Sequence, residues 1–454
     1  PITPVATTIL TIYRQSRENE MKKSLLVATY ALAIATPLLL SWHYFGNPRD
    51  ILQELGTILG MLAFAMILSE FALSGRMKSF SERVGMDATM RFHRIIGWLA
   101  LSAALLHPFF YESTPSGGLF PWDSSREFSV TSEFAAIATG VVALVLLPAL
   151  IVLAVWRSAL DYRYEVWRRL HGILAAAIAL LLLHHTLEAG RYAMHKNVAL
   201  LWQVLTVLAL LSLVYRYLLV PLRQRSKPWK VSRLERLTDK QWQLCLQPAG
   251  HDGLFYKAGQ FAWIKVGRSA LSIAENPFSI ASAPASGSEL SFVIKELGDF
   301  TSTLSEVEVG TIAYVDGAYG SLTVDGREEP GVVLIAGGVG IAPMLGILRQ
   351  MQQTKDTRKL KVIYGNREES QIVCADELSC VDTTFVVQEP EAGFEGTIGI
   401  VDAKMLDGCL NSEQLESWLF VICGPAPMME AVETYLKVQG VSDDRLLCER
   451  FNYD

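Results

Sequence analysis

Five histidines in two apolar stretches are the residues of this sequence best suited to redox chemistry. His93 and His107 lie in one stretch, and His171, His184 and His185 lie in another. Ionisable residues inside membrane-spanning segments are rare and usually functional. An α-helix rises about 1.5 Å and turns about 100° per residue, so residues 14 positions apart lie about 21 Å apart on nearly the same face. His93 with His107, and His171 with His185, have that spacing.

Matched histidines on two parallel helices are suited to holding two haems, one above the other, with each iron between two imidazoles. We expect His93 to pair with His171 near the cytosol, and His107 to pair with His184 or His185 near the outside. His184 follows His171 by 13 residues, so ideal helix geometry favours His185. Zinc is disfavoured, because its ligands surround a single point.

The composition indicates that part of the chain lies in a membrane. Of 454 residues, 51% are apolar and only 19% are charged, whereas soluble proteins carry about 25% charged residues. Residues 1–226 have a net charge of +6 and residues 227–454 a net charge of −12. This split predicts a basic membrane domain followed by an acidic soluble domain.

Six apolar stretches are long enough to cross a bilayer as helices. They lie at residues 23–45, 51–73, 92–112, 132–156, 169–188 and 197–220. Lys and Arg concentrate in the connections between the second and third stretches, between the fourth and fifth, and after the sixth. The positive-inside rule therefore predicts that both termini and the soluble half are cytosolic. The third and fifth stretches then run in the same direction.

Two short runs in the soluble half are candidate flavin-binding residues. Around them, alternating strands joined by turns predict an antiparallel β-barrel. The first run puts an aromatic ring beside a hydroxyl, which suits a flavin ring face and its N5 edge. The second run puts a glycine before a helix start, which frees backbone N–H groups for a diphosphate. The runs are Asn276, Pro277, Phe278 and Ser279, and Gly298, Asp299, Phe300 and Thr301.

From about Gly331 the pattern becomes βαβ, which is typical of an α/β nucleotide-binding domain. Glycines between a strand and a helix let the backbone approach a pyrophosphate, and a cation after the second strand can meet a ribose or its 2′-phosphate. An aromatic residue near the end of the chain, Phe451, is placed to cover a flavin. The nucleotide-binding candidates are Gly337, Gly338, Gly340, Pro343, Arg367, Cys423, Gly424 and Pro425.

In its order of motifs, the chain resembles the NADPH oxidase and ferric reductase superfamily, particularly its compact bacterial members. Six spans with paired histidines on the third and fifth resemble the ferric reductase transmembrane domain. The remainder resembles a ferredoxin–NADP reductase-type FAD and NAD(P)H dehydrogenase. The implied domains are an N-terminal cytosolic segment, a six-span haem domain, an FAD-binding β-barrel and an NAD(P)H-binding α/β domain, at residues 1–22, 23–222, 223–328 and 329–454.

The resemblance carries several assignments. It implies catalytic contacts by Ser279, Cys423 and Phe451, the last stacking on the flavin. It also leans slightly toward His184 as the fourth haem ligand, with His185 as the alternative. Asn276 stands where the family has a basic residue or histidine, which weakens the expected contact there. The implied cofactors are FAD, two b-type haems and NADPH or NADH.

The implied activity is electron transfer from cytosolic NAD(P)H through FAD and the haems to an acceptor on the outer face. The expected acceptor is dioxygen, which gives superoxide; a ferric chelate, a quinone or a periplasmic protein are alternatives. A function of another class is a transporter with a nucleotide-sensing domain. We expect a multi-pass protein of the bacterial inner membrane, in contact with the lipid bilayer and a small-molecule acceptor. Nucleic acid and an obligatory regulatory subunit are not expected as partners.

Overall fold

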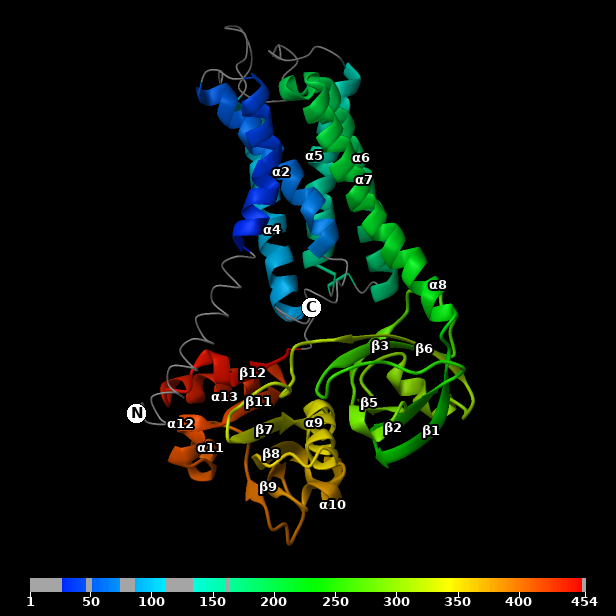
Figure 1. Cartoon of the computed structure of the whole chain (residues 1–454), viewed down its shortest axis with the longest axis vertical. Coiled ribbons are helices and arrows are strands. Elements are labelled where there is room, and N and C mark those ends of the chain that lie inside the picture. The colour runs from blue at the N-terminus through cyan, green and yellow to red at the C-terminus, as the bar shows by residue number, and fades with distance from the viewer. Residues whose placement is uncertain are drawn as a thin grey trace, which may run out of the picture. The chain divides into compact units, whose positions relative to one another are not determined.

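The computed structural model describes residues 27–45, 51–73, 86–110, 134–157, 159–160 and 163–450 (Figure 1). Among the described residues, their contacts separate a helical unit, which includes residues 89–218, from a second unit, which consists of residues 86–88 and the chain from Leu219. Phe451 lies outside the described residues, as does most of the predicted N-terminal segment.

The helical unit is built from long apolar helices. They are a helix over residues 27–45, α2 (Ile51–Leu73), α4 (Met86–Leu106) with the 3₁₀ turn η1 (His107–Phe110), α5 (Phe134–Val155), α6 (Tyr164–Ala189) and α7 (Lys196–Val214). In the described part of the chain, four segments are long and apolar enough to span a membrane. These are Glu54–Leu73, Phe134–Val155, Tyr164–Ala189 and Lys196–Arg225. The spans predicted at 23–45 and 92–112 fall on described helices that are not among these four, so a six-span domain stays a prediction.

Small residues let these helices pack closely. Ala100, Ala136, Ala143 and Ala179 are at most 1% exposed, whereas Val145 on the same helix as Ala143 is 63% exposed. Exposing many apolar side chains to water is unfavourable, whereas contact with lipid is not. Helix contacts inside lipid also favour small residues. This arrangement is that of a membrane protein.

The second unit begins with an antiparallel sheet. Its strands are β1 (Trp229–Thr238), β2 (Gln241–Pro248), β3 (Phe261–Val266), β4 (Asn276–Ser279), β5 (Leu290–Lys295) and β6 (Ile312–Tyr319), in the order β4-β3-β6-β1-β2-β5. An isolated bridge between Ile280 and Phe292 joins the chain after one edge strand to the other edge strand. The predicted antiparallel domain is therefore present, while a fully closed barrel stays a prediction.

A parallel sheet follows, with helices on both faces (Figure 1). Its strands are β7 (Gly331–Gly337), β8 (Lys359–Glu368), β9 (Asp382–Glu389), β10 (Thr397–Ile398), β11 (Leu419–Cys423) and β12 (Leu446–Cys448), in the order β10-β9-β8-β7-β11-β12. Alternate residues of β7 enter opposite cores: Val332 packs with α9 (Ile341–Gln353), and Val333 packs with α13 (Ala426–Val438). The strand order reverses between β7 and β11, which is where such sheets bind ligands.

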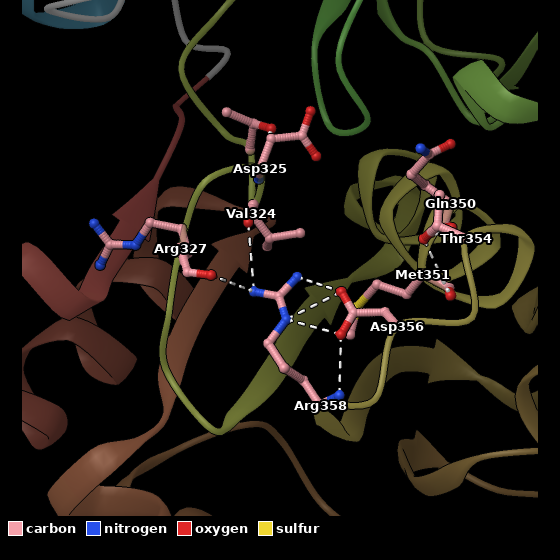
Figure 2. Close-up of polar contacts among 9 residues, drawn as sticks. Val324, Asp325, Arg327, Gln350, Met351, Thr354, Asp356 and Arg358 are labelled. Atoms are coloured by element: carbon pink, nitrogen blue, oxygen red, sulfur yellow. Dashed lines mark hydrogen bonds and ion pairs between the residues drawn. The ribbon is translucent and has the colours of Figure 1, made fainter. Parts of the chain in front are cut away.

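Arg358 fastens the chain segment that joins the two sheets (Figure 2). Its guanidinium donates to both carboxylate oxygens of Asp356, at distances of 2.6 to 3.0 Å, and to the backbone oxygens of Val324 at 3.4 Å and Arg327 at 3.5 Å. The hydrogen bonds from Arg358 lower the pKa of Asp356. The segment after β6 is therefore held against the turn between α9 and β8.

Candidate functional site

Two pairs of histidine rings lie next to each other in the helical unit, with interplanar angles of 59° in one pair and 80° in the other. The first pair is His93 on α4 and His171 on α6, with ring centres 6.4 Å apart. The second pair is His107, at the start of η1, and His185 on α6, with ring centres 6.3 Å apart. Metal–imidazole bonds of about 2 Å, plus about 1 Å from each nitrogen to its ring centre, place two such rings about 6 Å apart. Each pair therefore fits one iron between its two rings.

Glycines on two other helices leave room for the second pair. A Cβ added at Gly60 on α2 would lie 3.0 Å from Nδ1 of His107, and one added at Gly140 on α5 would lie 2.5 Å from Nδ1 of His185. Nδ1 of His185 also lies 2.8 Å from the backbone oxygen of Ala136. The second pair thus lies where α2 and α5 each have a glycine, which leaves space for the imidazole rings.

His184 points to a different neighbour. Its Nδ1 lies 3.1 Å from the hydroxyl oxygen of Thr139 on α5. The structure therefore brings His185 to His107, as the helix geometry favoured, whereas the resemblance leaned to His184. The reason is the angle between successive helical residues: 14 positions after His171 return to the same face, and 13 do not.

The first pair has a carboxylate partner that the sequence analysis missed. Glu70 on α2 contacts Nδ1 of His93. On the other side, the ring centre of Trp167 lies 5.3 Å from that of His171. An acid within an apolar stretch is the signal that could have identified Glu70.

The four residues of the first predicted flavin run form strand β4, which pairs with β3. Phe261 on β3 pairs with Ser279 on one side and with Tyr319 on the other. Ser279 therefore lies on one of the two strands that flank β3, and the end of β6 that contains Gly317 lies on the other. Asn276 and Pro277 open β4, where they pair with Ile264 and Trp263.

The second flavin run lies in the turn after β5. The side-chain oxygen of Thr301 accepts hydrogen bonds from the backbone N–H groups of Leu297 at 2.8 Å and Gly298 at 2.9 Å. The ring of Phe300 lies 6.3 Å from that of Phe278 on β4. Asp299 is in the same turn, where its backbone oxygen accepts from Ser302. The contact between the two phenylalanines brings the two predicted runs together.

The nucleotide candidates meet where the order of the parallel sheet reverses. A Cβ at Gly340 would lie 2.2 Å from the backbone oxygen of Cys423, and one at Gly424 would lie 3.0 Å from the backbone nitrogen of Gly337. Gly338 adopts a φ of +53°, which is in the left-handed region that favours glycine. The loop after β7 and the loop after β11 thus touch backbone to backbone. Two prolines complete this part of the site: Pro343 lies in α9, and Pro425 precedes α13.

Cys423 is close to a second acid that the sequence analysis missed. The thiol is buried, and burial raises its pKa, with a smaller contribution from Glu449 in the same direction. Glu449 is 1% exposed, and its carboxylate lies against Gly320. A Cβ added at Gly320 would lie 2.6 Å from a carboxylate oxygen of Glu449. The acid therefore links the thiol region to the glycine-containing end of β6. Its position directly after β12 is the only sequence signal for it.

Arg367 is the predicted nucleotide residue that stands apart from this cluster. It lies on β8, and its Nε donates to Glu389 on β9 at 3.0 Å. Both side chains are more than half exposed. A cation is thus present near the predicted ribose position, but a carboxylate already accompanies it.

Helix α9 joins the nucleotide loop to the flavin run. Arg349 donates to the backbone oxygen of Ala281 at 2.8 Å and to Glu377 at 2.6 to 2.7 Å. A Cβ at Gly346 would lie 2.6 Å from the backbone oxygen of Ile280. The helix that begins at the glycine loop therefore packs directly on the chain that follows Ser279.

Three protein families match successive parts of the chain. The ferric reductase like transmembrane component matches residues 59–182, the FAD-binding domain matches 246–363, and the oxidoreductase NAD-binding domain matches 334–434. The first match includes three members of the two histidine pairs and ends before His185.

The curated relatives match about half of this chain. The propane 2-monooxygenase reductase component of Rhodococcus jostii is 28% identical over 234 residues, which are 49% of this chain and 62% of the relative. The NADH oxidoreductase HCR of Escherichia coli is 28% identical over 230 residues, 49% of this chain and 68% of the relative. Among solved structures, the ferredoxin reductase in carbazole 1,9a-dioxygenase is 22% identical with a TM-score of 0.44, covering 50% of this chain and 69% of the other.

Proposed function

We propose that this chain transfers electrons across a membrane, from NAD(P)H through FAD and two b-type haems. The chain belongs to the NADPH oxidase and ferric reductase superfamily, because a ferric-reductase-like transmembrane component is fused to FAD-binding and NAD-binding domains. The acceptor that we propose is dioxygen on the outer face, which leaves as superoxide. We also propose the bacterial inner membrane, with six spans and with the flavin and nucleotide domains in the cytosol, on the strength of the basic connections in the sequence.

The two histidine pairs carry the proposal. Ring-centre separations of 6.4 and 6.3 Å fit one iron in each pair, and the same helix supplies one histidine to both. We assign His93 and His171 to one haem and His107 and His185 to the other. With both imidazoles of a pair on one iron, no position would be open for a further ligand, so a haem held this way would supply outer-sphere electron transfer.

The second unit supplies the two-electron side of the reaction. When bound, FAD converts the hydride chemistry of NAD(P)H into the one-electron chemistry that haem iron requires. We assign the flavin to β4 and the turn around Thr301, and the nicotinamide to the loops at Gly340 and Cys423. The raised pKa of Cys423 keeps its thiol neutral, so the residue contributes a contact and not a competing nucleophile.

A test of the haem assignment compares neighbouring histidines. In purified full-length protein, we expect a reduced-minus-oxidised haem spectrum and two haems per chain. His185→Ala loses one haem because a ligand is removed, and His184→Ala keeps both because its ring faces Thr139. Absence of a haem band from the unmutated protein contradicts the proposed function. Loss of haem from His184→Ala alone contradicts the choice of His185.

The acceptor is tested by NAD(P)H oxidation in membranes that contain the full-length protein. Cytochrome c and ferric citrate are offered separately, with and without superoxide dismutase. Cytochrome c reduction that the dismutase suppresses supports dioxygen as the acceptor. Ferric citrate reduction that the dismutase leaves unchanged, without superoxide formation, instead identifies a ferric-chelate reductase.

A further inference from the structure

Glu70 is a partly buried acid in a helix that has the length and composition of a membrane span. Its side chain is 12% exposed, and its carboxylate contacts Nδ1 of His93. A carboxylate in such a place is costly unless a partner compensates for the lost hydration. Tyr30 also approaches this region, because its hydroxyl lies 2.8 Å from that of Ser69 and its ring packs edge-on to Phe92. The helices around His93 thus provide a specific place for the acid.

The contact is at the nitrogen that a metal does not use. An imidazole that binds a metal through Nε2 carries its proton on Nδ1, and the acceptor of that proton fixes the ring orientation and raises the basicity of the ligand. We propose that Glu70 is a positioning residue for the haem between His93 and His171, and that its carboxylate lowers the reduction potential of that haem relative to the other. This inference rests on the proposed function, which supplies the haem.

The second pair has a neutral acceptor where the first pair has a carboxylate. Nδ1 of His185 lies 2.8 Å from the backbone oxygen of Ala136. A negatively charged acceptor stabilises the more positive, oxidised iron more than a neutral carbonyl does. The haem of the first pair is therefore harder to reduce, and electrons move in a favourable direction from the first pair to the second.

Glu70→Gln in the full-length protein tests the inference. A redox titration that resolves the two haems is expected to give two midpoint potentials in the unmutated protein. In Glu70→Gln, the lower midpoint potential rises by at least about 59 mV, which corresponds to a tenfold change in the one-electron reduction equilibrium. The higher midpoint potential does not change. The low-spin EPR signal of the same haem shifts, because the ligand loses its charged acceptor.

Glu54→Gln is the matched control. Glu54 is the other acid on α2. It is buried, and it accepts hydrogen bonds from Trp42 at 2.7 Å and from Tyr192 at 2.8 Å. The same loss of charge on the same helix is expected to leave the lower potential and the EPR signal of that haem unchanged. An equal shift of the lower potential in the two variants would make the effect a general one of charge and would overturn the assignment.

Haem content separates failure of this inference from failure of the proposed function. Glu70→Gln protein with two haems and unchanged potentials overturns the role of Glu70 and leaves the electron-transfer function standing. Unmutated protein without haem overturns the function itself. If Glu70→Gln does not accumulate, Glu70→Met replaces it, since it also removes the charge and has a similar volume. A shift of the lower potential alone supports the inference, and unchanged potentials refute it.

Discussion

Two glycines make room for the imidazole rings of the second histidine pair. Gly60 and Gly140 belong to different helices, and each faces the ring of one member of the pair. The sequence pattern predicts the histidines, because ionisable residues stand out in apolar stretches. It does not predict which glycines face them, because that depends on how α2 and α5 rotate against their neighbours. The same limit applies to the contact between Glu70 and His93, although an acid in an apolar stretch is itself visible in the sequence.

Gly140→Ala is expected to disturb one of the two haems. The added methyl group would lie 2.5 Å from Nδ1 of His185, so the ring must move. We expect loss of up to one haem per chain or a shifted spectrum of one haem, measured on purified protein. Gly97→Ala on α4 is the matched control, because among the described residues nothing lies within 4 Å of a Cβ there. An unchanged spectrum and haem content in Gly140→Ala would contradict the crowded geometry.

Arg367→Ala is expected to raise the KM for NADPH more than the KM for NADH. Loss of a charge-assisted hydrogen bond to the 2′-phosphate costs about 1.5–3 kcal/mol, which is roughly a 10- to 100-fold change. Steady-state kinetics with both nucleotides measures it. Arg236→Ala on β1 is the control, since that exposed arginine bonds the backbone of Asp239, outside the parallel sheet. Equal effects of Arg367→Ala on both nucleotides would remove the phosphate assignment.

Among the elements, local patterns predicted the soluble half well and the ends of the helices less well. Alternating residues gave the antiparallel strands, and the glycine loop gave the βαβ start at β7. The predicted third span continues through residue 112, whereas α4 ends at Leu106 and η1 begins at His107. Pro108 explains the difference, because a proline disfavours α-helical geometry in the residue before it. The edge bridge at Ile280 depends on contacts between distant strands, which no local pattern contains.

Asp356→Asn is expected to destabilise the joint between the two sheets. The partly buried carboxylate accepts hydrogen bonds from Arg358, so its loss costs about 1–3 kcal/mol of unfolding free energy at pH 7. The folded-state pKa of Asp356 is lowered, so this stability is present above the unfolded value of about 4 and disappears as pH falls through the lower folded value. Flavin fluorescence during thermal unfolding of the full-length protein follows it.

Glu413→Gln provides the control for that experiment. Glu413 pairs with Lys359 at 2.8 Å, but both side chains are more than half exposed, and exposed pairs contribute little. We expect no measurable change in unfolding. If Asp356→Asn and Glu413→Gln behaved alike at pH 7, or if the effect of Asp356→Asn persisted unchanged at the lowest pH, the structural role of the Arg358 contact would be refuted.

At the scale of the whole molecule, the charge split along the sequence corresponds to the two units of the structure. The net charge changes from +6 before residue 227 to −12 after it, and the contacts divide the chain at Leu218 and Leu219. The three family matches follow the same order. Motif order predicted this succession of families, because each family has its own sequence signature. The proposed acceptor, dioxygen, has no such signature.

Helix α9 connects the two sheets of the second unit at the site proposed for the nucleotide. Arg349 and Gly346 fasten this helix to the backbone just beyond Ser279, and the same helix starts at the loop assigned to the pyrophosphate. This helix therefore ties the sheet that contains β4 to the parallel sheet. We expect a cross-link between the two sheets to leave the exchange of oxidised for reduced nucleotide unchanged.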